Sequence, residues 1–189
     1  MIQRAHTIKL KPNKAQSILL AKTAGTTRYA YNWGLAKWNE LYEKGEKCDP
    51  YMLSRIWTQE RPDWALEVYN GAARKALLNL GGAFKAFFQG FRGHPTFHRK
   101  GQRDSFYVSH DKARLYGSKI RLPNIGRVRM TETLRYDDFK ILSYTVRRKA
   151  DGWYVSMCVD SEEERRPESD TIVVVDSWGH ALCRRSAGT

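Results

Sequence analysis

The apolar residues of this chain change their spacing near Gly90, and this change limits the folds that the chain can adopt. Before Gly90, apolar residues recur at intervals of three and four, which predicts a helix over 71–89 with one buried face. After Gly90, alternating residues predict strands, and Asp151-Gly152 has the residue types of a tight hairpin turn. The predicted strands cover residues 119–122, 127–130, 140–148 and 153–159. The sequence therefore predicts an α+β fold in which helices precede most of the strands.

The first 90 residues also contain signals for an opening strand and for the starts of helices. Residues 6–10 have strand alternation, and the capping-box pattern Asn13 to Gln16 predicts the start of a helix. We expect that helix to be interrupted near Gly25, with another helix after Asp49. Inside the 71–89 helix, Gly81 and Gly82 either permit close packing or weaken the helix, and the sequence leaves both alternatives open.

Positive charge is concentrated in the strand-rich part. The chain has 33 Lys and Arg residues against 20 Asp and Glu residues, and positions 90–149 hold fifteen of the basic residues against five acidic ones. Such a surface favours a polyanionic partner, because bound cations release the counterions of a phosphate backbone. Aromatic residues that could stack on bases are interleaved with these cations: Phe91, Phe97, Phe106, Tyr107, Tyr116 and Tyr144. The alternative is that the rings fill a small barrel and the cations keep it in solution, and any single ring is more often part of a core.

Other classes of site find little support in the sequence. No continuous apolar stretch predicts a membrane span or a signal peptide, so we expect a cytoplasmic protein. Cys48, Cys158 and Cys183 are far apart and form no Cys-x-x-Cys pair, and Gly93 and Pro95 argue against a shared helix face for His94 and His98. No phosphate-binding loop or nucleophile elbow is present, and no metal ligands or small-molecule substrate are predicted.

One carboxylate stands apart from the others. Asp176 directly follows the apolar run 171–175, which predicts a strand buried on both faces, as at the start of a parallel sheet. An Asp at the end of such a strand is the position of a first Mg²⁺ ligand in ribonuclease-H-type nucleases. The alternative is a turn residue. A two-metal site needs further carboxylates, and no acidic residue follows Asp176.

Several ordered motifs together resemble one family. Arg28-Tyr-Ala-Tyr-Asn-Trp33 is similar to Arg-Phe-Val-Tyr-Asn-Trp, and Leu80-Gly-Gly-Ala-Phe-Lys-Ala-Phe-Phe88 is similar to Leu-Asp-x-Ala-Phe-x-x-Phe-Phe. Pro95-Thr-Phe-His-Arg-Lys-Gly101 and Asp104-Ser-Phe106 are similar to Pro-x-Phe-Lys-Lys-Lys-Gly and Asp-Ser-Phe. In this order they resemble the N-terminal part of the TnpB (OrfB) proteins of insertion-sequence transposons. Those proteins are RNA-guided DNA nucleases related to type V CRISPR effectors.

The resemblance implies an architecture. An oligonucleotide-binding-like β-barrel, the wedge, would comprise residues 1–12 and 91–160, with a helical recognition insert at 13–90 that includes a helix-turn-helix. A linker at 161–170 would lead to residues 171–189, the truncated start of a ribonuclease-H-like domain. Asp176 would be its first catalytic aspartate, although Ser177-Trp178-Gly179 departs from the family pattern. Mg²⁺ and structural Zn²⁺ are expected only in full-length relatives, and this chain would need no cofactor.

The resemblance also implies partners and contacts. The wedge and helices would hold a guide RNA scaffold and double-stranded DNA, and Tyr51, Asn70 and Arg74 would face a short motif beside the target. The cations expected to bind phosphates are Arg92, Arg99, Lys100, Arg103, Arg121, Arg127, Arg147 and Arg148.

Three hypotheses for the function follow from the resemblance. The first is a truncated transposon protein that binds nucleic acid without a complete nuclease site and is not itself an enzyme. The second is an active RNA-guided endonuclease or transposase whose missing half comes from another chain. The third is a DNA-binding repressor.

Overall fold

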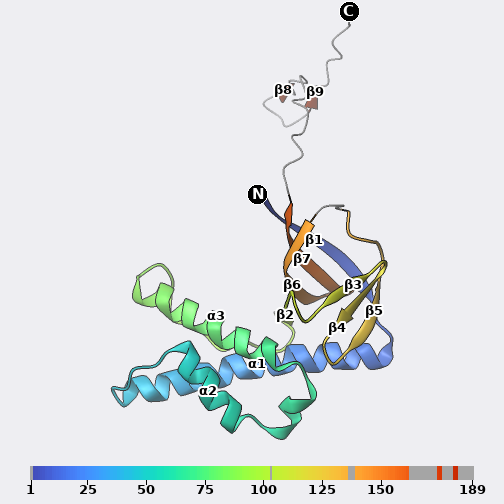
Figure 1. Cartoon of the computed structure of the whole chain (residues 1–189). Helices are drawn as coiled ribbons and strands as arrows, with labels where there is room; N and C mark the ends of the chain where they lie inside the picture. The colour runs from blue at the N-terminus through green and yellow to red at the C-terminus, as the bar shows by residue number, and fades with distance from the viewer. Residues whose placement is uncertain (1, 103, 136–138, 162–173, 176–180, 183–189) are drawn as a thin grey trace, which may run out of the picture.

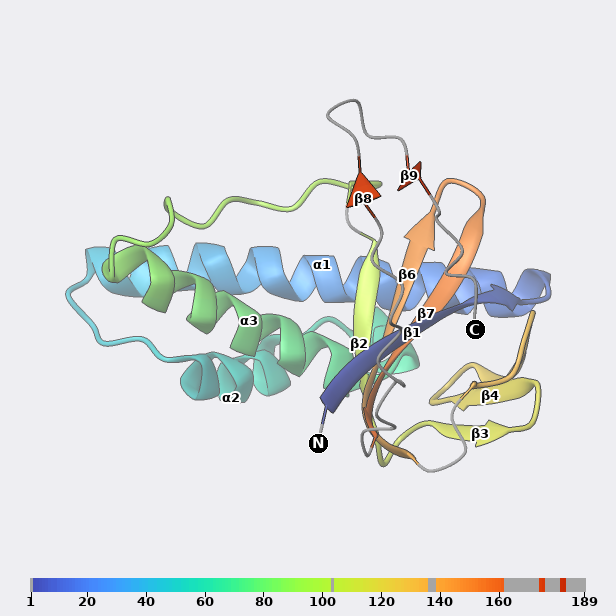
Figure 2. The same cartoon turned by 90° about the horizontal axis from the view of Figure 1, so that it is seen from above.

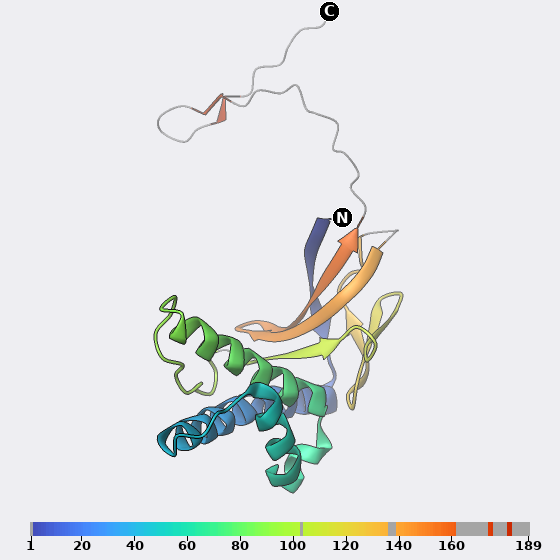
Figure 3. The same cartoon turned by 60° about the vertical axis from the view of Figure 1, so that its left-hand side comes forward.

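A helical region and an antiparallel sheet make up the described part of the chain, in agreement with the predicted α+β class. The computed structural model describes residues 2–102, 104–135, 139–161, 174–175 and 181–182. Strand β1 (Ile2–Lys11) comes first and is followed by the helices: α1 (Lys14–Glu43), α2 (Pro50–Glu60), a short 3₁₀ helix (Asp63–Glu67) and α3 (Asn70–Phe88). The main sheet is completed by β2 (Ser105–Ser109), β3 (Arg114–Tyr116), β4 (Lys119–Leu122), β5 (Gly126–Met130), β6 (Phe139–Lys149) and β7 (Gly152–Ser161). The helices lie beside one end of the curved sheet (Figures 1 and 3).

Strand β1 joins the two halves of the sheet. The strand order is β2-β6-β7-β1-β5-β4-β3, and every pairing is antiparallel. Residues Ile2 to Lys9 of β1 pair with β7, whereas Leu10 and Lys11 pair with β5. A strand from the start of the chain therefore lies at the centre of a sheet whose other strands all follow the helices.

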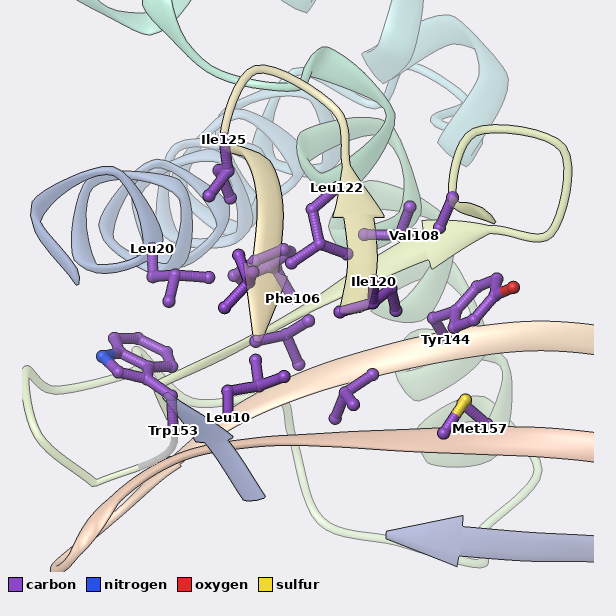
Figure 4. Close-up of a cluster of buried hydrophobic side chains, with 14 of the residues drawn as sticks. Leu10, Leu20, Phe106, Val108, Ile120, Leu122, Ile125, Tyr144, Trp153 and Met157 are labelled. Carbon is purple, nitrogen blue, oxygen red and sulfur yellow. The ribbon is translucent and has the colours of Figure 1, made fainter. Parts of the chain in front are cut away.

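The core of the sheet follows from strand alternation. Successive side chains of a strand point to opposite faces, so every second residue is buried. One row across four strands is Phe106, Val146, Val155 and Ile8. Figure 4 shows side chains from both halves of the sheet converging with Leu20 of α1. The aromatic residues considered for base stacking fall into two groups. Phe106 and Tyr144 are buried in this core, whereas Phe91, Phe97 and Tyr116 are exposed.

Helix α1 is continuous, and the predicted interruption near Gly25 is wrong. The predicted capping box forms at its start, where Asn13 and Gln16 exchange hydrogen bonds between side chains and backbone amides. Before Gly25, Leu20 packs in the sheet core, and after it Leu35 packs in a second core with α2 and α3. Burial on both sides outweighs the cost of about 1 kcal/mol for one interior glycine.

Close packing of the helices depends on two other glycines. A Cβ atom on Gly34 would lie 2.5 Å from a methyl group of Leu77, so this glycine lets α1 approach α3. A Cβ atom on Gly81 would lie 2.7 Å from Pro50 Cγ, whereas one on Gly82 would meet nothing within 4 Å. Of the two alternatives left open by the sequence, Gly81 permits close packing, and Gly82 only lowers helix propensity.

Several strands differ from their predicted extents. Strand β1 is longer than the predicted 6–10, and β2 and β3 were not predicted as strands at all. Strands β8 (Val174–Val175) and β9 (Ala181–Leu182) pair antiparallel, whereas the apolar run predicted the start of a parallel sheet. Only five residues connect β8 to β9, and a parallel crossover needs a dozen or more. Asp176 lies outside the described residues. Among the described helices, none combines the length and apolarity required to cross a bilayer.

Candidate nucleic-acid interface

The segment between α3 and β2 is fastened to helix α1 by polar contacts. Arg28 donates a hydrogen bond of 2.6 Å to Asp104, and both side chains are mostly shielded from solvent. The Asn32 amide exchanges two hydrogen bonds with the backbone of His98, at 2.8 and 3.0 Å. The His98 ring stacks on Tyr31 with 3.9 Å between centroids and 6° between planes. The segment therefore follows α1 back towards the sheet (Figure 2).

A cleft of about 280 Å³ opens where this segment, the helices and the sheet edge meet. It lies between α1 and α3 on one side and β2 and β6 on the other. Lys75 Nζ lies 5.1 Å from the centroid of the Tyr107 ring, so a cation and an aromatic ring share the cleft. The lining residues are Thr27, Arg28, Tyr31, Ala72, Lys75, Ala76, Asn79, His98, Ser105, Phe106, Tyr107 and Thr145.

A second hollow of about 240 Å³ continues this surface over the outer face of the sheet. Thr145 borders both hollows, which makes them neighbours. The alternation that buries Val146 and Val155 directs the side chains of the second hollow outwards. They are Thr7, Thr145, Arg147, Lys149, Tyr154 and Ser156. We call the surface formed by Lys75, Tyr107, Thr145, Arg147, Lys149 and Tyr154 the outer strip.

Most of the positive charge on the outer strip is not neutralised. Arg147, Lys149 and Lys75 have no ion-pair partner among the described residues. Lys149 Nζ lies 4.4 Å from the centroid of the Tyr154 ring. The strip therefore combines uncompensated cations, aromatic rings and hydroxyl groups, the chemistry that suits an unpaired nucleic-acid strand.

Asp151 lies beside the far end of this surface, and its carboxylate is already engaged. It accepts hydrogen bonds of 2.8 Å from Lys9 and 2.6 Å from the Tyr154 hydroxyl. The Lys9 bond, followed by the Tyr154 bond, lowers the pKa of Asp151 to about 2. The same contacts raise the pKa of Lys9 and of Tyr154, in each case chiefly through the hydrogen bond to Asp151. Asp151 thus remains ionised and fixes the Tyr154 ring at the end of the outer strip.

The predicted phosphate-binding residues fall on different surfaces. Arg147 lies on the outer strip, and Arg148, the next residue of β6, lies 6.0 Å from the Trp153 ring centroid. Arg121 and Arg127 are exposed on β4 and β5, at the other end of the strand order. Arg92, Arg99 and Lys100 are exposed on the segment fastened to α1, and Arg103 lies outside the described residues.

The residues predicted to face a DNA motif do not form one cluster. Asn70 accepts a hydrogen bond of 3.2 Å from Trp57, near the end of α2, and Arg74 is exposed one turn further along α3. Tyr51 is exposed at the start of α2, where its neighbour Pro50 packs beside Gly81. Eleven helical residues, or about 16 Å, separate Asn70 from Gly81. Tyr51 therefore lies near the other end of the contact between α2 and α3.

The sequence-based prediction did not single out Lys75, Thr145, Lys149 or Tyr154 as site residues. The available signal was strand alternation, which places Thr145, Arg147 and Lys149 on one face of β6. Nothing local relates them to Lys75 on α3, because the cleft forms only when α3 packs against β2.

Metal-binding groups do not gather in the part of the chain that is described. No group of three or more His, Cys, Asp or Glu side chains is placed to hold a metal there. The His94 ring packs edge-on against Phe84 and Phe87, whereas His98 is stacked on Tyr31. Burial, with a smaller effect of Asp49, raises the pKa of Cys48 to about 11, so this thiol stays protonated at neutral pH.

Two comparisons with known proteins place the chain among its relatives. A family model described as a helix-turn-helix domain, HTH_OrfB_IS605, matches residues 1–47, which form β1, α1 and the turn after it. The Escherichia coli (strain K12) protein named "Putative RNA-guided DNA endonuclease InsQ" is 28% identical over 193 residues. The resemblance to the TnpB/OrfB family is confirmed.

The match to this OrfB relative covers 98% of the chain and 48% of InsQ, so the chain spans about half the length of InsQ. The structure adds a spatial relationship to the OrfB-like motifs. Arg28 and Asn32, from the first motif, contact Asp104 and His98, from two later motifs. Residues that carry the resemblance therefore fasten the helices to the segment before β2.

Proposed function

We propose that this OrfB-like chain binds nucleic acid in an insertion-sequence system, with a guide RNA and double-stranded DNA as partners. The outer strip is the observation that carries this proposal. Its cations have no ion-pair partner among the described residues, Tyr107, Tyr154 and the Thr145 hydroxyl line its two hollows, and it extends from the cleft beside α3 across β6 and β7. The name of the relative, "Putative RNA-guided DNA endonuclease InsQ", supports the choice of partners.

In this proposal, the curved sheet acts as the oligonucleotide-binding-like wedge, and residues 13–90 act as the helical recognition insert. The outer strip would hold an unpaired RNA segment, since phosphates would meet Arg147 and Lys149 while bases approach Tyr107 and Tyr154. Arg74, exposed on α3, remains the proposed contact to a base of the DNA motif.

Binding of single-stranded RNA tests the role of the outer strip. Arg147→Gln combined with Lys149→Gln should weaken binding about tenfold or more and make log K depend less steeply on log salt. A matched control removes two exposed cations from the helices, Arg55→Gln and Lys85→Gln, and should bind as the unaltered chain does. Equal losses in both double variants would show that only net charge matters and would refute the role of the outer strip.

A further inference from the structure

Strands β3, β4 and β5 bring arginines directly opposite one another. In the strand register, Arg121 pairs with Arg114 on one side and with Arg127 on the other. In the next row, Lys119 pairs with Arg129, which also pairs with Lys11 of β1. We call the six exposed residues of these two rows the cation ladder: Lys11, Arg114, Lys119, Arg121, Arg127 and Arg129.

The arrangement of the cation ladder is unfavourable without a partner. Like charges directly opposite each other on neighbouring strands destabilise a sheet. Strands β3, β4 and β5 contain no Asp or Glu, and none of the six cations has an ion-pair partner among the described residues. A face that serves only solubility would mix both signs of charge. A bound polyanion would relieve the repulsion within this face.

We propose that the cation ladder binds the phosphate backbone of a double-helical nucleic acid. Apart from Tyr116, its outward side chains are Lys and Arg, and an extended array of such cations suits contacts to phosphate oxygens, which carry no sequence information. Tyr116 is the single ring on the outward face of β3, β4 and β5, and the Arg127 guanidinium lies 4.6 Å from its centroid. The outer strip has two rings, so this face offers less stacking to an unpaired strand.

The dimensions of the cation ladder also suit a duplex. Four strands, β3, β4, β5 and β1, carry it, and neighbouring strands lie about 4.8 Å apart, so its width is about 14 Å. This width is close to that of the B-DNA major groove, about 12 Å. Cations at the two sides of the ladder can therefore contact phosphates on both strands of a duplex.

The cation ladder lies on β3, β4, β5 and the end of β1, whereas the sheet residues of the outer strip lie on β2, β6 and β7, so the two surfaces use different strands and adjoin where β1 pairs with β7. The inference rests on the proposed function in taking nucleic acid as the partner. It adds that paired segments bind the ladder, whereas unpaired segments bind the outer strip. The two surfaces should therefore be separable by mutation.

Binding of a DNA duplex of arbitrary sequence, followed at several salt concentrations, tests the proposal. Arg121→Gln combined with Arg127→Gln should lower duplex affinity and reduce the slope of log K against log salt by about 2. Single-stranded RNA should bind this variant normally, and Arg55→Gln with Lys85→Gln again serves as the matched control. An unchanged slope with duplex would overturn the inference.

Thermal stability provides a second measurement. Loss of a merely structural residue would lower the Tm, whereas loss of a residue from the proposed binding surface should raise it. Arg121→Thr removes the middle charge of an arginine row and introduces a β-favouring residue. At low salt and without nucleic acid, the variant should have a Tm about 1–3 °C higher, while its duplex affinity falls. A lower Tm would mean that Arg121 stabilises the sheet and would count against the ladder as a binding surface.

The two proposals fail in different ways. If the outer-strip variant loses single-stranded RNA while the ladder variant keeps duplex, this inference fails and the proposed function stands. If the unaltered chain binds neither probe, both fail.

Discussion

Arg28 in helix α1 donates a hydrogen bond of 2.6 Å to Asp104, 76 positions later in the chain. The pair links the helical region to the residue before β2, directly beside the cleft that leads to the outer strip. Its carboxylate and guanidinium are 14% and 23% exposed, so water screens the pair less than it screens a surface ion pair.

We expect Arg28→Ala to destabilise the fold by about 1–3 kcal/mol, because it leaves the shielded carboxylate of Asp104 without its charged donor. Urea unfolding measures the change. Lys22→Ala is the matched control, since Lys22 and Glu67 also lie 2.6 Å apart but are about half exposed. That control should cost less than about 1 kcal/mol. Equal costs for the two variants would contradict the prediction.

Gly34→Ala should destabilise the helical core by about 1–3 kcal/mol, because the new methyl group would overlap Leu77 and press on Leu80. Gly82→Ala is the opposite case, since its methyl group has open space and alanine favours helix by about 1 kcal/mol. Thermal unfolding should therefore give a lower Tm for the first variant and a higher Tm for the second. A Tm for Gly34→Ala equal to or above that of the unaltered chain would refute the close packing of α1 on α3.

Acid should release the contact between Asp151 and Lys9. The folded pKa of Asp151, about 2, lies below its ordinary value of 3.8, so this contribution to stability is present above pH 4 and is lost as pH falls through 2. NMR titration of the Asp151 carboxyl group measures the pKa. Lys9→Met should return it towards 3.8, because the largest cause of the shift is removed. A pKa near 3.8 in the unaltered chain would contradict the contact.

We expect no Mg²⁺-dependent DNA cleavage from the 189-residue polypeptide, because Asp176 is the one candidate catalytic aspartate and a two-metal site needs more carboxylates. Incubation with guide RNA and target duplex, followed by electrophoresis, tests this prediction. Cleavage that disappears in Asp176→Ala would overturn it and favour an active endonuclease.

Much of the fold was predictable where the signal is local. The Asp49 cap and the apolar face of α3 predicted two helices within a few residues, and Asp151-Gly152 predicted the hairpin between β6 and β7. Local signals wrongly predicted an interruption of α1 at Gly25, because packing against two cores keeps this helix continuous. They also failed for β3, whose three residues are too few to show an alternation.

The site was predictable in composition but not in arrangement. The excess of cations in 90–149 indicated a nucleic-acid partner. Strand register divides those cations between two surfaces, with Arg147 on one and Arg121 on the other. Register was not predictable because it depends on pairing between distant segments. Lys75 reaches the outer strip only because α3 packs on the edge of the sheet.

The central position of β1 also sets the order in which the protein can be built. Ile2 pairs with Ser161, so β1 waits for its partner until almost all of the described chain has left the ribosome. The helices between them make local contacts and can form earlier, because short-range contacts close quickly and distant ones slowly. For much of its synthesis, the nascent chain therefore carries β1 as an unpaired, aggregation-prone strand.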